Sequence, residues 1–387
     1  MLLRYKRKEL FLSNDLNQTQ LNNSNLNLDE IDKEKSVLES YPRRIVLELT
    51  NDCNLNCVMC GRFSSEFKKT YFDINWLYNL ESILPYVEEV TLMGWGEPTV
   101  HPKFIDMLKY LNEFNVRKYF CTNGMLLDKL KDSIFKYKAD IIAVSLDSAK
   151  KSKNNNIRRG SDFDKITNGI RNLKIEQKKR NLDFPYINFV TTIMKDNLYE
   201  LPDIICLADD LQIEEVKVVY LTAFSDSLKD KTLYNCFDEV KNVFKESLKL
   251  SEKLGIDLKL PYIQNEDIAG DKAHKNCYVG WRDLFIGSDG YTRPCMSTSQ
   301  KFFHISEYNT FNELWNNKEY QKFRKTVNNF NCVNSTMGSN NSTNDCENKD
   351  MMPLNCVNCY QSSHCNWNKR TSFIQMDENF APKWEKI

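Results

Sequence analysis

Three cysteines stand close together in the segment "LELTNDCNLNCVMCGR", residues 47–62, at Cys53, Cys57 and Cys60, directly after an apolar run. Thiolates bind soft metals, and three of them on one short loop suit three corners of a cubane iron-sulfur cluster. Such a cluster would leave its fourth iron open to another ligand. Two other interpretations stay open, namely a zinc site that borrows a fourth ligand and a set of unligated core cysteines.

A second group of cysteines lies downstream, at Cys277, Cys295, Cys356 and Cys359. Four thiolates from two separate pieces of chain can ligate a second cubane cluster completely and leave no iron open. We therefore expect a second cluster that transfers electrons. A tetrahedral zinc site on the same four thiolates meets the same spacing and remains the alternative.

The remaining cysteines carry weaker signals. Cys332 and Cys346 stand in residues 331–350, a low-complexity stretch that predicts an exposed insertion with free thiols, although these two could replace missing ligands. The role of Cys365 is left open. Three isolated cysteines are expected to be small core residues: Cys121, Cys206 and Cys236.

Composition excludes several classes of protein. Lys and Arg together number 53, as do Asp and Glu, so the net charge of zero gives no bulk attraction to nucleic acid or an anionic membrane. Thirteen clustered cysteines in 387 residues are too sparse for a disulfide scaffold and favour metal sites. The chain shows neither a signal peptide nor a run of about 18 apolar residues. A cytoplasmic, reducing location is therefore expected.

Short apolar runs alternate with helical stretches from about Tyr41 onward. The runs are typical of buried parallel strands and cover residues 44–49, 89–94, 117–122, 141–146, 186–193 and 216–221, with a further strand-like run at 256–260. Six strand-helix units in succession predict an α/β fold with a parallel sheet and helices outside. The sheet is either a curved, partly closed barrel or doubly wound, and both place chemistry at the carboxyl ends of strands.

Changes in composition along the sequence predict three regions. Residues 1–40 are polar and asparagine-rich, which predicts an arm or linker, and residues 41–264 carry the strand-helix rhythm. Cysteines, aromatics and turn residues replace that rhythm in residues 265–387. There, "DLFIGSDGYTRPC" predicts a hairpin with its turn at 288–290, and residues 310–327 predict one helix.

Motifs at successive strand ends follow the first cysteine loop: "GWGEP" (94–98), "TNG" (122–124) and "VSLDS" (144–148). Together with "CNLNCVMC" after a strand, they resemble the radical S-adenosylmethionine (radical SAM) enzymes from about residue 43 to 222. The resemblance implies a partial (β/α)6 TIM-like barrel. It also implies that a [4Fe-4S] cluster binds SAM at its open iron and cleaves it to methionine and a 5′-deoxyadenosyl radical, which abstracts a hydrogen from the substrate.

The resemblance also implies roles for residues at the matching positions. The three cysteines of the first loop would hold the catalytic cluster, and Met59 would pack on the adenine of SAM. Gly96 and Glu97 would meet the methionine amino group, which needs acceptors and close backbone approach. Thr122 and Asn123 would face the ribose. Ordinary turns at both motifs are the alternative interpretation.

Two further motifs would contact SAM under the same resemblance. Ser145 and Asp147 lie on one side of a strand, where they either contact SAM or cap the strand end. Arg158 and Arg159 stand where an arginine would grip the SAM carboxylate with its bidentate fork. The sequence does not decide between these two arginines, and a solvated basic turn remains possible for them.

The second cysteine group resembles the auxiliary-cluster extension called SPASM or, in its shortened form, twitch. The resemblance rests on Cys277, Trp281, "DGYTRPC", "NELW" and "CVNC". The full pattern continues as Cx2Cx5Cx3C, whereas Lys369 stands at the fourth place here. We therefore expect one auxiliary [4Fe-4S] cluster, held by Cys277, Cys295, Cys356 and Cys359.

These features predict a radical SAM oxidoreductase that passes an electron from the substrate radical to the auxiliary cluster, as in dehydrogenation of a small molecule. Maturation of a ribosomally made peptide is the first alternative. A non-catalytic zinc-binding protein is an alternative of another class, but it leaves the three strand-end motifs unexplained. The resemblance also implies a low-potential electron donor such as flavodoxin or ferredoxin, and no nucleic-acid or membrane partner is expected.

Overall fold

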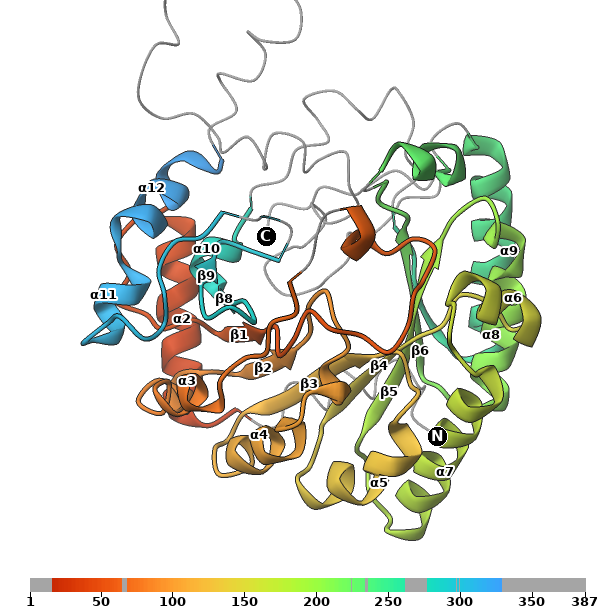
Figure 1. Ribbon diagram of the computed structural model, residues 1–387, viewed down its shortest axis with the longest axis horizontal. Coiled ribbons are helices and arrows are strands. Elements are labelled where there is room, and N and C mark those ends of the chain that lie inside the picture. The colour runs from red at the N-terminus through yellow and green to blue at the C-terminus, as the bar shows by residue number, and fades with distance from the viewer. Residues whose placement is uncertain are drawn as a thin grey trace, which may run out of the picture.

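The computed structural model describes residues 16–64, 68–223, 225–233, 236–261, 277–296, 298 and 300–328. Within these residues a nine-stranded sheet runs through the molecule, and helices cover its outer face (Figure 1). The strand order is β7-β6-β5-β4-β3-β2-β1-β8-β9. A doubly wound sheet would reverse its strand order at a switch point. The unbroken order from β1 to β7 therefore identifies the curved, partly closed barrel, and the doubly wound alternative is wrong.

The barrel strands pair in parallel, each with the next along the chain. They are β1 (Arg44–Leu47), β2 (Glu89–Leu92), β3 (Arg117–Thr122), β4 (Ile141–Ser145), β5 (Tyr186–Ile193), β6 (Glu215–Tyr220) and β7 (Asp257–Lys259). Every predicted strand run is confirmed. Along β3 the side chains alternate, because Phe120 packs on Phe104 of the outer helices while Tyr119 and Cys121 face the inner side.

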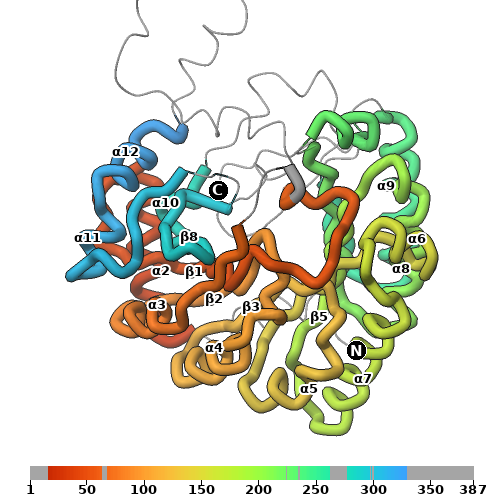
Figure 2. The backbone as a smooth tube through the Cα atoms, viewed as in Figure 1, coloured from red at the N-terminus to blue at the C-terminus, as the bar shows by residue number. Residues whose placement is uncertain are grey.

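Helices follow the outside of the sheet (Figure 2). The α-helices that accompany the barrel are α3 (Ile74–Tyr78), α4 (Phe104–Leu111), α5 (Leu127–Lys136), α6 (Lys151–Ile157), α7 (Phe163–Lys179), α8 (Leu201–Asp210) and α9 (Phe237–Leu254). Short 3-10 helices are η1 (Gly61–Ser64), η2 (Leu84–Tyr86), η3 (Pro98–Val100), η4 (Leu198–Glu200) and η5 (Asp226–Lys231). Within the described residues, no helix combines the length and apolar content that a bilayer crossing needs.

The C-terminal region continues the sheet of the barrel. Strand β8 (Asp283–Ile286) pairs in parallel with β1, and β9 (Thr292–Arg293) pairs antiparallel with β8. The hairpin predicted here is confirmed, and Gly290 in its turn has a φ of 78°, which favours glycine. No local pattern indicated that this hairpin would extend the barrel, because pairing between distant strands depends on register.

Residues 1–40 were predicted to form a loosely held arm or linker, and for residues 17–40 this prediction is wrong. Helix α2 (Gln18–Asp32) begins at an Asn17 capping box, and several of its polar side chains are buried. The Gln20 amide donates to the carbonyl oxygen of Val87 at 2.7 Å. A polar sequence can pack in this way because backbone carbonyls of the barrel satisfy its side chains.

The single helix predicted for residues 310–327 is also wrong. The chain forms α11 (Phe311–Trp315) and α12 (Lys318–Thr326), preceded by the short α10 (Val279–Arg282). Asn317 caps α12, since its side-chain oxygen accepts from the backbone N–H of Tyr320 at 2.9 Å. Asparagine favours such a cap over continuing a helix.

The isolated cysteines differ from one another. Cys206, predicted to be a core residue, is exposed on α8, whereas Cys121 and Cys236 are half-buried. A cysteine on a helix can face either side, so its burial follows from the helix face rather than from its residue type.

Candidate active site

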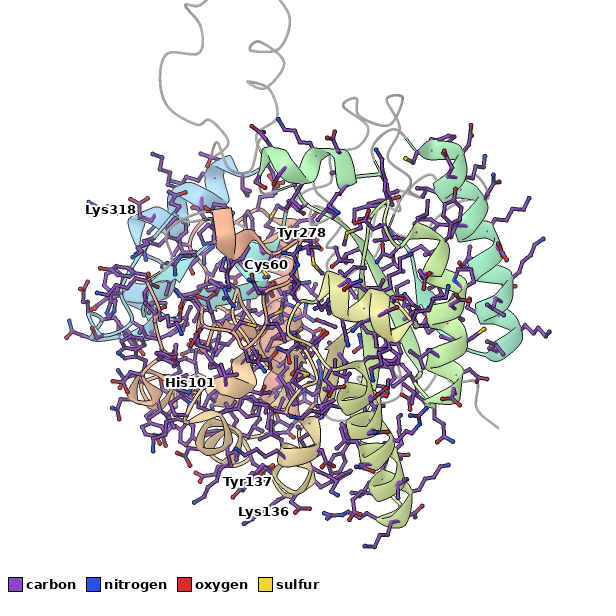
Figure 3. All side chains as sticks on the ribbon, turned by 45° about the vertical axis from the view of Figure 1, so that its right-hand side comes forward. Cys60, His101, Lys136, Tyr137, Tyr278 and Lys318 are labelled. Carbon is purple, nitrogen blue, oxygen red and sulfur yellow. The ribbon has the colours of Figure 1, made fainter. Side chains whose placement is uncertain are left out.

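The first cysteine loop follows β1 at the carboxyl end of the barrel, and all three of its thiols are half-buried. Its backbone pairs with the end of α6 and the residues that follow, because Asn56 donates to Arg159 O at 2.8 Å and Val58 to Ile157 O at 2.9 Å. Cys60, labelled in Figure 3, donates its N–H to Cys57 O at 3.2 Å. These bonds fix the loop across the strand ends, where both predicted architectures placed the chemistry.

Burial disfavours a free thiolate in this loop. It raises the pKa of Cys57 to about 11, although the nearby Arg158 charge opposes the shift, and it also raises the pKa of Cys53. Among the described residues, no three His, Cys, Asp or Glu side chains are placed to hold a single metal ion. Three spaced thiols that need positive charge fit the separate corners of a cubane cluster better than one zinc ion.

Glu97 joins the ends of two strands beside the loop. It is 3% exposed, and it accepts from Thr99 Oγ1 at 2.5 Å, Thr122 Oγ1 at 2.7 Å and the Asn123 N–H at 2.6 Å. Burial raises the pKa of Glu97, while these neutral donors oppose the shift. The backbone N–H of Glu97 donates to Asp52 O at 2.9 Å, directly before Cys53.

Gly96 and Asn123 bring this motif against the cysteine loop. A Cβ at Gly96 would lie 2.3 Å from the carbonyl oxygens of Thr50 and Asp52, so only glycine fits. The Asn123 amide donates to Asn54 Oδ1 at 2.7 Å and lies 3.8 Å from the Cys53 sulfur. The structure thus brings the predicted "GWGEP" and "TNG" residues together at the start of the loop.

Asp147 and Arg158 form a buried ion pair on the other side. Asp147 is fully buried, and its carboxylate accepts from the Thr192 N–H at 2.7 Å and lies 2.8 Å from Arg158 Nε. Although burial opposes the charge of Arg158, Asp147 and the Cys57 thiolate raise its pKa. Arg159 is exposed, so Arg158 is the arginine whose guanidinium reaches the site.

The last two predicted contacts, Ser145 and Met59, also lie at the carboxyl end of the barrel, which we call its mouth. Ser145 ends β4 and is half-buried. Met59 is 8% exposed and packs with Ile157, Met194 and Leu221 in a small apolar cluster beside the loop. Cys57 and Val58 pack against this cluster, so it lies directly beside the cysteine loop.

Two asparagines that the sequence did not single out hold the ion pair in place. Asn154 Oδ1 accepts from the Asp147 N–H at 3.1 Å, and the Asn197 amide donates to Asp147 O at 2.9 Å. Both are nearly or fully buried. The available signal was weak, namely asparagines shortly after a strand end, where side chains often bond to the backbone.

The structure describes only part of the second cysteine group. Cys277 and Cys295 are half-buried, and the Cys277 N–H donates to Asn328 Oδ1 at 2.7 Å. The other predicted ligands and the uncertain cysteines lie outside the described residues: Cys332, Cys346, Cys356, Cys359 and Cys365. The four-thiolate set therefore stays a prediction.

Protein-family models match both the barrel and the C-terminal region. The Radical SAM superfamily model matches residues 47–200, and SPASM, an iron-sulfur cluster-binding domain, matches residues 277–347. The chain belongs to the radical SAM superfamily. This radical SAM enzyme therefore uses a [4Fe-4S] cluster and SAM, and its SPASM domain implies auxiliary iron-sulfur binding. The loop that carries Cys53, Cys57 and Cys60 lies within the first match.

Relatives of this radical SAM enzyme have different roles. The chain is 23% identical over 313 residues to the tungsten-containing aldehyde ferredoxin oxidoreductase cofactor-modifying protein of Pyrococcus furiosus, covering 74% of this chain and 84% of that protein. It is 24% identical over 323 residues to PqqA peptide cyclase of Bradyrhizobium diazoefficiens, covering 76% and 79%. Its fold resembles Streptococcus suis SuiB bound to S-adenosylmethionine, with a TM-score of 0.61, 16% identity and coverage of 81% and 74%.

Proposed function

We propose that this enzyme abstracts a hydrogen atom from its substrate and passes an electron from the substrate radical to an auxiliary cluster, giving net oxidation. When bound, the [4Fe-4S] cluster and SAM supply the 5′-deoxyadenosyl radical for that abstraction. The observation that carries the proposal is the buried pair of Arg158 and Asp147 next to Cys57, at the mouth of the barrel. It provides a fixed binding group beside the cluster thiols.

Arg158 suits the carboxylate of SAM. Within the described residues, Asp147 is the only partner of its side chain and lies at Nε. The two outer nitrogens of the guanidinium are left for a second carboxylate, which an arginine fork binds with two parallel hydrogen bonds. Arg159 is exposed and contributes its carbonyl oxygen to the loop instead, so we assign the SAM contact to Arg158.

Glu97 suits the amino group of SAM. Its Oε2 accepts only from the Asn123 N–H among the described residues, which leaves a direction open for an ammonium donor. Thr122 donates to Glu97 and accepts from the Gly124 N–H at 3.1 Å, so its hydroxyl is used to position the carboxylate. Asn123 remains the candidate for the ribose, and Gly96 lets the backbone approach.

The adenine and the substrate side follow from the remaining residues. We assign the adenine to Met59 and its apolar cluster, and a further polar contact to Ser145, whose hydroxyl has no partner among the described residues. Asp147 acts through Arg158 rather than on SAM itself, since its carboxylate is fully buried. A low-potential flavodoxin or ferredoxin would supply electrons, and an oxygen-sensitive cluster favours the reducing cytoplasm.

Oxidation of a small molecule is the leading chemistry, with Cys277, Cys295, Cys356 and Cys359 as ligands of the auxiliary cluster. A relative named as cofactor-modifying supports a small substrate. A second candidate, modification of a ribosomally made peptide, is favoured by the similarity to a peptide cyclase over 76% of this chain. The two candidates differ in substrate rather than in the first radical step.

The test is anaerobic reconstitution followed by counts of iron and 5′-deoxyadenosine. About eight irons per chain are expected if two cubanes form, and dithionite with SAM should release 5′-deoxyadenosine. Stoichiometric zinc without this product would contradict the proposal. Supplying small-molecule and peptide fractions separately, and measuring which one increases 5′-deoxyadenosine release, would decide between the two substrate classes.

A matched pair of double variants tests the auxiliary ligands. Replacing Cys356 and Cys359 by Ala should leave SAM cleavage intact, remove about four irons and stop product formation. The control replaces Cys332 and Cys346, which lie inside the SPASM match at residues 277–347, whereas the first pair lies beyond it. Iron loss in the control alone would show that the ligands were assigned to the wrong pair.

A further inference from the structure

Helix α12 holds both described cysteine segments of the auxiliary site. Asn328, just after the helix, accepts from the Cys277 N–H at 2.7 Å and donates to Cys277 O at 3.4 Å. Tyr320 within the helix donates its hydroxyl to Arg293 O at 3.3 Å, two residues before Cys295. Helix α12 and Asn328 just after it therefore contact both segments.

Arg324 is a buried charge in the last turn of α12. It is 2% exposed, and its donors reach Gly280 O at 2.8 Å, Trp315 O at 2.9 Å and Ser36 O at 3.0 Å. A fourth bond joins it to Asn316 Oδ1 at 3.0 Å. Its guanidinium also lies over the Trp315 ring, 4.5 Å from the ring centre. Within the described residues it forms no ion pair, so backbone and amide oxygens alone satisfy this cation.

Ser36 belongs to an N-terminal clamp, which we define as residues 17–40. Figure 2 shows the clamp, in red, beside α11 and α12, in blue. Beyond Arg324, the indole N–H of Trp281 donates to Lys35 O at 2.6 Å, and that of Trp315 donates to Ser40 O at 3.2 Å. The C-terminal region is thus hydrogen-bonded to the last residues of the clamp, 35–40.

The other end of the clamp is bonded to the barrel. Gln20 donates to Val87 O at 2.7 Å, just before β2, and Asn23 donates to Tyr86 O at 3.2 Å. Hydrogen bonds therefore join the barrel to the clamp, and the clamp to Arg324 of α12.

We propose that Arg324 is a positioning residue for the auxiliary iron-sulfur site. By joining α12 to the clamp, it fixes the segments of Cys277 and Cys295 against the barrel that carries the SAM site. The role rests on the proposed function, since it takes these two cysteines as ligands of the auxiliary cluster. A planar guanidinium can serve four acceptors spread around it, whereas the compact ammonium of lysine has three donors. The shape of Arg324, and not its charge alone, carries the role.

The test compares two variants of the full chain with a matched control. Arg324→Met keeps an apolar stem but loses all four bonds, and Arg324→Lys keeps the charge. Lys325→Met changes the exposed neighbour on the same helix. Both Arg324 variants should lose about four irons, or shift the electron paramagnetic resonance signal of the auxiliary cluster, with SAM cleavage unchanged. The signal is isolated by combining each variant with Ala at Cys53, Cys57 and Cys60. Lys325→Met should match the wild type.

Several outcomes would overturn the proposal. An unchanged auxiliary signal in Arg324→Met would remove the positioning role, and an unchanged signal in Arg324→Lys would show that charge suffices. If Arg324→Met does not fold, Trp281→Phe with Trp315→Phe takes its place, because it removes two further bonds between the C-terminal region and the clamp and keeps an aromatic ring at each position. An unchanged signal there would also overturn the proposal. Only about four irons in the wild-type chain would refute the proposed function before any variant is made.

Discussion

Two buried carboxyl groups lie beside the cysteine loop, and their partners differ in charge. Burial raises the pKa of both Glu97 and Asp147. Glu97 interacts with the Cys53 end of the loop and receives only neutral donors from the described residues, whereas Asp147 is paired with the guanidinium of Arg158 next to Cys57. Among the described residues, one side of the mouth therefore carries the Glu97 carboxyl group without a cationic partner. The other side carries the ion pair of Asp147 and Arg158, whose guanidinium has further N–H donors to offer.

This difference matches a zwitterion placed between the two sides. An ammonium group would stabilise the charged form of Glu97, and a carboxylate would bind the outer nitrogens of Arg158. The amino-acid end of SAM carries both groups. We therefore propose that the asymmetry of the mouth sets the orientation of SAM on the loop, with its amino group toward Glu97.

Removing the loop ligands should have the largest effect, because it eliminates what the two sides share. Replacing Cys53, Cys57 and Cys60 by Ala should abolish 5′-deoxyadenosine release while about four irons remain at the auxiliary site. Iron analysis and product chromatography measure both quantities. Retained SAM cleavage in this variant would mean that another part of the chain binds the catalytic cluster.

Breaking the Asp147 side should have the next largest effect. Arg158→Met leaves the buried Asp147 carboxylate without its partner, which typically costs about 3–5 kcal/mol in the free energy of unfolding. It should also eliminate most SAM binding to the reconstituted enzyme. Denaturant unfolding and equilibrium binding measure the two effects.

Two controls separate the causes of that loss. Arg159→Met changes an exposed side chain and should alter the free energy of unfolding by no more than about 0.5 kcal/mol. Adding Asp147→Asn to Arg158→Met removes the buried charge and should restore much of the stability but not the SAM binding. Restored binding would show that Arg158 acts only through the fold.

Changing the Glu97 side should cost less, because its partners are neutral. Glu97→Gln keeps the shape but removes acceptor capacity at residue 97, on which the donors Thr99, Thr122 and Asn123 depend, and this should cost about 1–3 kcal/mol in the free energy of unfolding. SAM binding should weaken without being lost. If Glu97→Gln destabilised the protein more than Arg158→Met, the two sides would not differ as we infer.

The barrel and its mouth were largely predictable from local sequence. Strand runs, strand-end motifs and the spacing of Cys53, Cys57 and Cys60 are short-range patterns, and the structure places the motifs around the loop. The choice between Arg158 and Arg159 was not predictable, because it depends on which side chain turns toward Asp147. Two neighbouring arginines have the same chemistry, but their side chains point in different directions.

The N-terminal clamp and the extended sheet were beyond local reasoning. Residues 17–40 look like a linker because they are polar, yet Gln20 and Asn27 are fully buried and donate to backbone carbonyls far along the chain. Likewise, β8 pairs with β1 across 239 positions, from Arg44 to Asp283. Such partners become visible only when the chain is folded, since a polar side chain does not reveal which distant carbonyl will satisfy it.

The smallest expected effect concerns the apolar cluster on the Asp147 side. Met59→Leu conserves volume among Ile157, Met194 and Leu221, so it should change the free energy of unfolding by less than about 1.5 kcal/mol. SAM binding should change only slightly, because a hydrophobic contact with adenine tolerates a similar side chain. Denaturant unfolding and SAM titration against the wild type measure both. A loss of binding as large as that of Arg158→Met would place the decisive recognition in the apolar cluster, and the charge asymmetry of the mouth would then be secondary.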